Sequence, residues 1–206
     1  MREDRFWDRL ADRYSQQPIA DLNAYQTKLE ITQGYLRPDM DLLEFGCGTG
    51  GTAIIHAPHV RQITAIDFSE AMLAIARSKA ADAGVSNLRF ERADISGFSA
   101  ADASYDVVLG LSILHLLPDR DAVIAKVFRL LKPGGRFISS TACLGDTMGL
   151  LKVAAPIGKA LGILPHLDVM TTAELLRSLE DAGFFLEHQW QPGKGKAVFI
   201  VAARPH

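Results

Sequence analysis

Cysteine is scarce in this chain, and long apolar runs are absent. The two cysteines, Cys47 and Cys143, stand far apart, so they offer neither a disulfide framework nor the spacing of metal ligands. No stretch reaches the roughly 18 uninterrupted apolar residues that a membrane-spanning helix needs. The first residues, MREDRFWDRLADRY, are densely charged and lack the apolar core of a secretory signal. We therefore expect a protein of the reducing cytoplasm.

An excess of charge of one sign is absent as well. The chain has 206 residues, of which 22 are basic and 24 acidic, and its formal net charge is −2. Proteins that bind nucleic acid usually present a concentrated basic face, so DNA and RNA are not expected as partners. The length suits one domain, 1–206, with a full core. The expected partner is a small molecule, and the oligomeric state stays open.

From residue 41 onward, short apolar runs alternate with segments of helical period. This alternation is typical of βαβ units around a parallel sheet, so the predicted fold class is α/β. Parallel strands are predicted at 42–45, 62–67, 88–92, 105–110 and 135–142. A C-terminal segment, 171–206, is predicted to hold a helix and then an antiparallel hairpin at the sheet edge, with strands at 184–190 and 197–204.

Capping residues mark the ends of the predicted helices. Ser69 is placed to cap a helix that Gly84 would end. A later helix stops at KPGG, because proline cannot continue a helix. Thr171 and Glu174 have the spacing of a capping box, and Gly183 stands where that helix would end.

Two segments fall outside the alternation. Residues 1–36 are predicted to form a helical N-terminal cap. Residues 143–170 are apolar but broken by proline and glycine, with Lys152 and Lys159 spaced to share a helix face. We interpret this segment as a lid that forms an apolar wall of a substrate pocket. A packed helical cap and a peripheral membrane contact through the two lysines are the alternatives.

The stretch DLLEFGCGTGGTA follows the first predicted strand and carries two overlapping patterns. The dinucleotide pattern G-x-G-x-x-G is met by Gly46, Gly48 and Gly51. The pattern E-x-G-x-G-x-G is met by Glu44, Gly46, Gly48 and Gly50. Ligands of parallel α/β sheets bind beyond the carboxyl ends of the strands, where glycine lets the backbone approach them closely. The loop is therefore predicted to bind a nucleotide-bearing ligand.

Acidic residues help to separate the two patterns. Asp67 ends the second strand about 20 residues after the loop, where a carboxylate accepts ribose hydroxyls in either kind of site. Glu44 adds negative charge beside the loop, which favours a ligand with an ammonium group and disfavours a pyrophosphate. Asp94 follows the third strand, where it can accept a hydrogen bond from an adenine amino group while the Ile95 N–H meets a ring nitrogen.

Five motifs then stand in a specific order and spacing: LEFGCGTG, AIDFSEAML, RADI, YDVVLGLSILHLL and LLKPGGRF. Together they resemble a class I S-adenosylmethionine-dependent methyltransferase of the small-molecule type, over roughly residues 40–142. The resemblance implies a Rossmann-like, doubly wound, mostly parallel seven-stranded sheet whose last strand is antiparallel. It also implies S-adenosyl-L-methionine as cofactor, S-adenosyl-L-homocysteine as product, and an O, N or C nucleophile as methyl acceptor. The acceptor is expected to be small and largely apolar.

The resemblance implies a set of residues that contact the cofactor. They are Glu44, Gly46, Cys47 and Gly48 at the methionine part, Asp67 at the ribose, Phe68 and Met72 beside the adenine, Asp94 and Ile95 at the adenine edge, and the carbonyls of Gly110 and Leu111 at the ammonium group.

Two residues are candidates for a catalytic role. His115 follows the fourth predicted strand and is the candidate general base, because its side chain titrates near physiological pH. A histidine that packs a helix is the alternative. Tyr14, like Tyr25, lies in the N-terminal helical segment, and in similar enzymes an N-terminal tyrosine element covers the site. Ordinary core packing is again the alternative, and methyl transfer itself requires chiefly that the acceptor be held in line.

Two other functions stay open. An NAD-dependent oxidoreductase would use the dinucleotide pattern and would need neither Glu44 nor Asp94. A non-catalytic protein that binds S-adenosylmethionine would keep the loop and Asp67 yet show no turnover. A metal site is not expected. His56 and His59 form an H-x-x-H pair but no further ligand stands at a suitable spacing, and we expect them as a surface pair favoured by the helix dipole.

Overall fold

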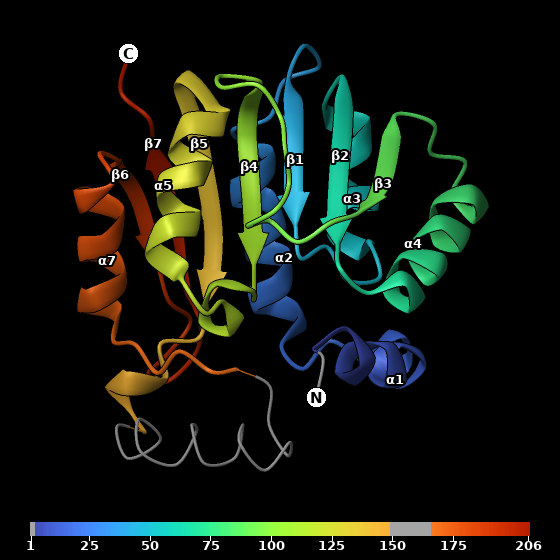
Figure 1. The fold of residues 1–206 in the computed structure, drawn as a ribbon, viewed down its shortest axis with the longest axis horizontal. Helices are drawn as coiled ribbons and strands as arrows, with labels where there is room; N and C mark the ends of the chain where they lie inside the picture. Colours follow the sequence, from blue (N-terminus) through green and yellow to red (C-terminus); the bar gives the residue numbers. More distant parts are fainter. Residues whose placement is uncertain (1–2, 149–165) are drawn as a thin grey trace. The chain divides into compact units, whose positions relative to one another are not determined.

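The computed structural model describes residues 3–148 and 166–206, and Figure 1 shows the course of the chain. By its internal contacts, the chain divides into two compact units, residues 1–99 and 100–206. The extent of the predicted single domain, and its subdivisions, stay predictions. Among the described residues, no helix has both the length and the apolar character that crossing a bilayer requires.

The sheet has seven strands: β1 (Asp41–Phe45), β2 (Gln62–Asp67), β3 (Leu88–Arg92), β4 (Tyr105–Leu111), β5 (Leu131–Thr141), β6 (Phe185–Trp190) and β7 (Val198–Ala203). Their order is β3-β2-β1-β4-β5-β7-β6. The pairs β1 with β2, β2 with β3, and β4 with β5 are parallel, whereas β7 is antiparallel to both β5 and β6. The predicted α/β class, with a mostly parallel seven-stranded sheet and an antiparallel last strand, is confirmed.

The first unit surrounds strands β1 to β3 with helices. These are α1 (Glu3–Gln16), α2 (Leu22–Gln33), α3 (Gly51–His56) with the short η1 (Ala57–His59), and α4 (Glu70–Asp82). Strands β1 and β2 bury most of their side chains, as strands do when both sheet faces are covered. The α4 helix begins as predicted, because the Ser69 hydroxyl accepts a hydrogen bond from the Met72 N–H at 3.2 Å. Helix α1 packs on α4 within this unit.

The second unit holds the other four strands. Its helical elements are η2 (Leu114–Leu116), α5 (Arg120–Leu130), η3 (Leu144–Asp146) and α7 (Thr172–Asp181). The predicted stop of α5 before KPGG is correct, but β5 begins at once, so KPGG lies inside the strand. Gly134 makes this possible, because it adopts a φ of 76° there and donates from its N–H to the Arg204 carbonyl.

The described ends of the predicted lid segment lead into and out of residues 149–165. Most of the predicted lid, including Lys152 and Lys159, lies outside the described residues. The helix that follows begins with the predicted capping box, in which the Thr171 hydroxyl accepts from the Glu174 N–H and the Glu174 carboxylate accepts from the Thr171 N–H. Gly183, with a φ of 96°, comes directly after the end of α7.

Candidate active site

The loop between β1 and α3 requires glycine at three positions. Gly46, Gly48 and Gly50 have φ angles of 64°, 52° and 73°, a region that side chains with a Cβ rarely adopt. Gly51 is not among the residues with positive φ, and a Cβ added there would meet nothing within 4 Å. The backbone therefore needs the glycines of E-x-G-x-G-x-G, and it does not need the third glycine of the dinucleotide pattern.

The same loop packs tightly inside the first unit. A Cβ on Gly50 would lie 2.9 Å from the Cβ of Ala76 on α4 and 3.0 Å from the ring of Phe90 on β3. The Gly48 N–H donates to the Asp67 carboxylate at 2.9 Å, which ties the loop to the end of β2. The loop is thus held on the sheet by packing on one side and by an acidic residue on the other.

Asp67 is buried and holds two backbone N–H groups. One carboxylate oxygen accepts from Gly48 and the other from Ser69, each at 2.9 Å, and the residue is 8% exposed. Burial raises the pKa of this carboxyl, while the hydrogen bonds from backbone N–H groups oppose the rise. Each oxygen can accept a second hydrogen bond. Asp67 can therefore hold the loop and still receive the two hydroxyls of a ribose.

Glu44, on β1, is a buried carboxyl with an orphaned oxygen. The residue is 3% exposed, and its Oε2 atom has no hydrogen-bond partner among the described residues. Burial raises its pKa to about 8, and the negative charge of Asp67 adds to the rise. A buried ionisable group in this position is costly unless a partner satisfies it. An ammonium group suits this oxygen, whereas a pyrophosphate would add negative charge beside it.

The N-terminal helices bring further side chains to the loop. The Asp8 carboxylate on α1 accepts from the hydroxyl of the serine that caps α4, at 2.6 Å. The ring of Tyr14 lies against the loop, with Cε1 3.9 Å from where a Gly48 Cβ would stand, and the residue is 49% exposed. Burial raises the pKa of Tyr25 on α2, and Glu44 contributes to the rise. Sequence reasoning missed Asp8, because an acidic residue in a charged helix looks solvated.

The predicted adenine contacts lie after β2 and β3 of this unit. Phe68 is half-buried, and its carbonyl accepts from the Arg92 side chain at 3.1 Å. Met72 and Ile95 are almost fully buried, whereas Asp94 is exposed and accepts from a nearby N–H with one carboxylate oxygen. Arg92 was not predicted. It fixes the backbone next to Asp67, and no motif in the sequence announces it.

The second unit carries the other candidates at the end of β4. Gly110 is buried and Leu111 half-buried, paired in parallel with β5. Ser112 follows with a φ of 57° and donates from its N–H to the Ser140 carbonyl at 2.7 Å. A serine held in the left-handed region is strained, and such strain concentrates at functional loops. Nothing in the residue type at position 112 predicts this conformation.

His115 lies in η2, three residues further on. Burial lowers the pKa of its imidazole, so the ring is neutral at neutral pH. Its Nδ1 atom is buried and has no hydrogen-bond partner within residues 3–148 and 166–206. Its backbone carbonyl accepts from the Asp168 N–H at 2.8 Å. A neutral imidazole carries one nitrogen lone pair and can accept a proton, as a general base must.

Burial changes the titration of His56 and of Cys47. His56 is fully buried, and burial lowers its pKa to about 4, whereas His59 is exposed. The prediction of a surface pair is therefore wrong for His56, because α3 ends there and η1 folds the ring inward. In the described part of the chain, no three His, Cys, Asp or Glu side chains gather as a metal site would require. Burial also raises the pKa of the Cys47 thiol far above its ordinary value, so this loop cysteine is not a thiolate nucleophile.

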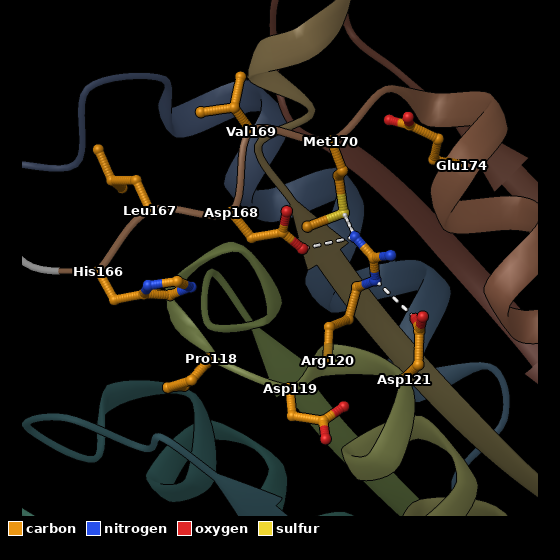
Figure 2. Close-up of a pocket in the computed structure, with 10 residues that line it drawn as sticks. All are labelled: Pro118, Asp119, Arg120, Asp121, His166, Leu167, Asp168, Val169, Met170 and Glu174. Carbon is orange, nitrogen blue, oxygen red and sulfur yellow. Dashed lines mark hydrogen bonds and ion pairs between the residues drawn. The ribbon is translucent and has the colours of Figure 1, made fainter. Parts of the chain in front are cut away.

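A cavity of about 550 Å³ opens in the second unit between the start of α5 and residues 166–170 (Figure 2). Its wall mixes charged side chains, such as Asp119 and Arg120, with apolar ones, such as Leu167 and Val169. The volume lies within the range of small-molecule sites.

The chain is similar in sequence to known methyltransferases. A family model described as a methyltransferase domain matches residues 42–135. The chain is 32% identical over 189 residues to a ubiquinone biosynthesis O-methyltransferase of Xanthomonas axonopodis pv. citri, covering 89% of this chain and 77% of that protein. It is 40% identical over 125 residues to the 27-O-demethylrifamycin SV methyltransferase of Amycolatopsis mediterranei, covering 60% of this chain and 43% of that protein.

Solved structures share the fold. The S-adenosylmethionine-dependent methyltransferase of Mesorhizobium loti superposes with a TM-score of 0.70 at 22% identity, over 86% of this chain and 96% of that one. The first curated relatives are longer proteins, of which this chain spans about half, namely 52%, 43% and 44%.

Proposed function

Because the chain belongs to the class I S-adenosylmethionine-dependent methyltransferases, we propose that it transfers the methyl group of S-adenosylmethionine to a hydroxyl oxygen of a small, largely apolar molecule. The choice of oxygen is supported by the names of the Xanthomonas and Amycolatopsis relatives, which refer to an O-methyltransferase and to a 27-O-demethyl compound. The apolar character is supported by the composition of residues 143–170.

The observation that carries this proposal is the pair of buried carboxyl groups at the ends of β1 and β2. Asp67 would accept the ribose hydroxyls, and the orphaned Glu44 oxygen would accept the ammonium group of the cofactor. A dinucleotide would place a pyrophosphate near Glu44, which offers the carboxyl no cationic partner and would repel its ionised form. The loop also does without Gly51, the third glycine of the dinucleotide pattern. Both features favour S-adenosylmethionine over NAD.

The protein's part in the reaction would be to orient, to exclude water and to take up a proton. When bound, S-adenosylmethionine supplies a methyl group already activated by its sulfonium charge. By resemblance to the family, the backbone carbonyls of Gly110 and Leu111 would accept hydrogen bonds from the ammonium group, and Phe68 with Asp94 and Ile95 would bind the adenine. The neutral imidazole of His115 would take up the proton that the acceptor hydroxyl loses on methylation. An amine acceptor would need this base less.

Calorimetry tests the cofactor half of the proposal. Purified protein is titrated separately with S-adenosylmethionine, S-adenosylhomocysteine and NAD, and the titrations are repeated with Asp67→Ala. We expect saturable binding of the two sulfur nucleosides, strongly weakened in the variant. Binding of NAD alone would overturn the proposal and make the loop a dinucleotide site.

Methyl-labelled S-adenosylmethionine tests the acceptor half. The three probes are 3,4-dihydroxybenzoate for a phenolic oxygen, 2-phenylethylamine, which has no hydroxyl, for an amine and ethyl acetoacetate for a carbon acid. We expect labelled product from the phenolic hydroxyl. Label on the amine or carbon probe instead would refute the choice of oxygen. Tight cofactor binding with no labelled product from any probe would favour a non-catalytic binding protein.

A further inference from the structure

Residues 166–170, which we call the strap, join two loops of the second unit. The Asp168 N–H donates to the carbonyl of His115, in the loop after β4, at 2.8 Å. Two residues on, the Met170 carbonyl accepts from the N–H of Gly145, in the loop after β5, also at 2.8 Å. A Cβ on Gly145 would lie 2.8 Å from the Met170 carbonyl oxygen, so the two backbones touch. The strap therefore crosses from one loop to the other and bonds to each.

Arg120, at the start of α5, holds the strap by its side chain. Its Nη1 atom lies 2.6 Å from the Asp168 carboxylate and 3.1 Å from the Met170 sulfur, as Figure 2 shows. The other branches of the guanidinium meet the Ser178 hydroxyl on α7 at 3.3 Å and the Asp121 carboxylate at 3.0 Å. One planar group thus joins the strap, α5 and α7.

Burial makes this contact specific. The Arg120 side chain is 13% exposed, and that of Asp168 is 32% exposed. A guanidinium that is mostly removed from water is expensive to leave without its carboxylate, and its fixed fork of N–H groups matches several acceptors at once. Loss of either partner should therefore loosen the strap, although its backbone hydrogen bonds to the two loops remain.

The contact between Arg120 and Asp168 influences the position of the His115 imidazole. Its Nδ1 atom has no hydrogen-bond partner among the described residues, so no bond to that nitrogen orients the ring. The position of the ring therefore depends on the backbone of η2. The strap bonds directly to that backbone, through the same residue, Asp168, whose carboxylate Arg120 holds.

We propose that Arg120 and Asp168 are positioning residues for methyl transfer, which fix the place of the His115 imidazole by clamping the strap onto its loop. The inference rests on the proposed function for its catalytic meaning, because it takes His115 as the base. The clamp itself is a structural contact that does not depend on the proposed function. It predicts that removal of the ion pair disturbs the His115 ring and the Asp168 amide while leaving the cofactor loop of the first unit unchanged.

Two variants test the clamp, and a third serves as control. Arg120→Met keeps the length of the side chain and removes its charge, and Asp168→Asn is the milder change on the more exposed partner. Arg136→Met is the matched control, because Arg136 forms a two-point ion pair with Glu187, at 2.9 and 3.1 Å, away from the strap and the His115 loop. All proteins are saturated with S-adenosylhomocysteine.

The first measurement needs no turnover. NMR follows the His115 ring Cε1–H signal, identified by its loss in His115→Gln, together with hydrogen exchange at the Asp168 amide. Both clamp variants should shift the ring signal and speed the exchange at least about 10-fold, whereas Arg136→Met should change neither. An unchanged ring signal and exchange rate in both clamp variants would overturn the proposal. So would equal changes in the control.

The second measurement uses 3,4-dihydroxybenzoate and labelled S-adenosylmethionine. Misplacement of the base should lower kcat about 10-fold to 100-fold in both clamp variants, with the KM for S-adenosylmethionine unchanged. A loss that appears only in that KM would count against a positioning role. If the wild-type protein binds the cofactor but yields no methylated product, the proposed function fails, and the NMR measurement still decides whether the clamp holds the His115 loop.

Discussion

Glu44→Gln isolates the effect of one buried charge. The wild-type carboxyl is 3% exposed, and burial raises its pKa to about 8 from an ordinary value of 4.5. Glutamine has nearly the same shape but cannot ionise. The substitution therefore leaves the packing of β1 almost intact and removes the carboxylate that we propose to pair with the ammonium group of the cofactor.

The size of the effect follows from the shift in pKa. One pKa unit corresponds to about 1.36 kcal/mol, so the rise from 4.5 to about 8 corresponds to about 5 kcal/mol. Because the pKa of the folded state lies above that of the unfolded state, this contribution to stability is fully present below about pH 4.5. It is lost as the pH rises through about 8. Between about pH 4.5 and about pH 9, the free energy of unfolding of ligand-free wild type should fall by up to about 5 kcal/mol relative to Glu44→Gln.

Binding of the cofactor should then release a proton. At pH 7 a carboxyl with a pKa of about 8 is roughly 90% protonated, and pairing with an ammonium group requires the ionised form. Titration with S-adenosylhomocysteine in phosphate and in Tris, whose ionisation enthalpies differ, should give about 0.9 proton released by wild type. Glu44→Gln should release about 0.9 proton less than wild type, since any proton change at the amino group of the ligand is taken as equal in both proteins. The variant should also bind the ligand more weakly, because it lacks the carboxylate. Equal proton counts for the two proteins would refute the reasoning.

Three further predictions concern single side chains. Asp67→Ala should weaken S-adenosylhomocysteine about 100-fold in calorimetry, because two hydrogen bonds to a charged group are lost, whereas the exposed Asp94→Ala should cost less than about 10-fold; equal losses would contradict the assigned contacts. His115→Gln should lower kcat on 3,4-dihydroxybenzoate about 100-fold or more and abolish the acid limb of the pH profile, which in wild type should lie below the ordinary histidine value because burial lowers this pKa; an unchanged kcat would leave the ring a packing role. His56, whose folded pKa is about 4, contributes stability that is complete above about pH 6.5 and lost as the pH falls through about 4. In urea unfolding at decreasing pH, wild type should therefore lose up to about 3 kcal/mol of unfolding free energy that His56→Leu retains. Parallel losses in both proteins would show that the buried imidazole is not responsible.

Local physical chemistry made several elements predictable from the sequence. Strands β2 and β3 have the bounds that their apolar runs indicate, Gln62–Asp67 and Leu88–Arg92. The capping serine of α4 and the capping box of α7 were predicted, because each cap involves residues three apart in the chain. The order and spacing of the cofactor motifs indicated the family, because each motif is a short local stretch of the chain.

The backbone angles support the glycine pattern that the acidic residues and the order of the motifs already favoured. The glycine spacing alone fits both patterns, because glycine occupies position 50 and position 51. In the structure, Gly50 has a φ of 73° and packs against α4 and β3, whereas Gly51 tolerates a Cβ. The angle depends on how the loop joins β1 to α3, and single residue types do not encode it.

The class of the fold, the helix caps and the acidic residues near the carboxyl ends of β1, β2 and β3 could be predicted from the sequence, because they depend on neighbours along the chain. Folding brings about three features that no local pattern indicates: the burial of His56, the orphaned oxygen of Glu44 and the clamp of Arg120 on Asp168. Each of these depends on which distant segments pack around a side chain, and so on how far water is removed from it. Desolvation sets the pKa of the two buried groups and gives the ion pair its strength, and no pattern of adjacent residues measures it.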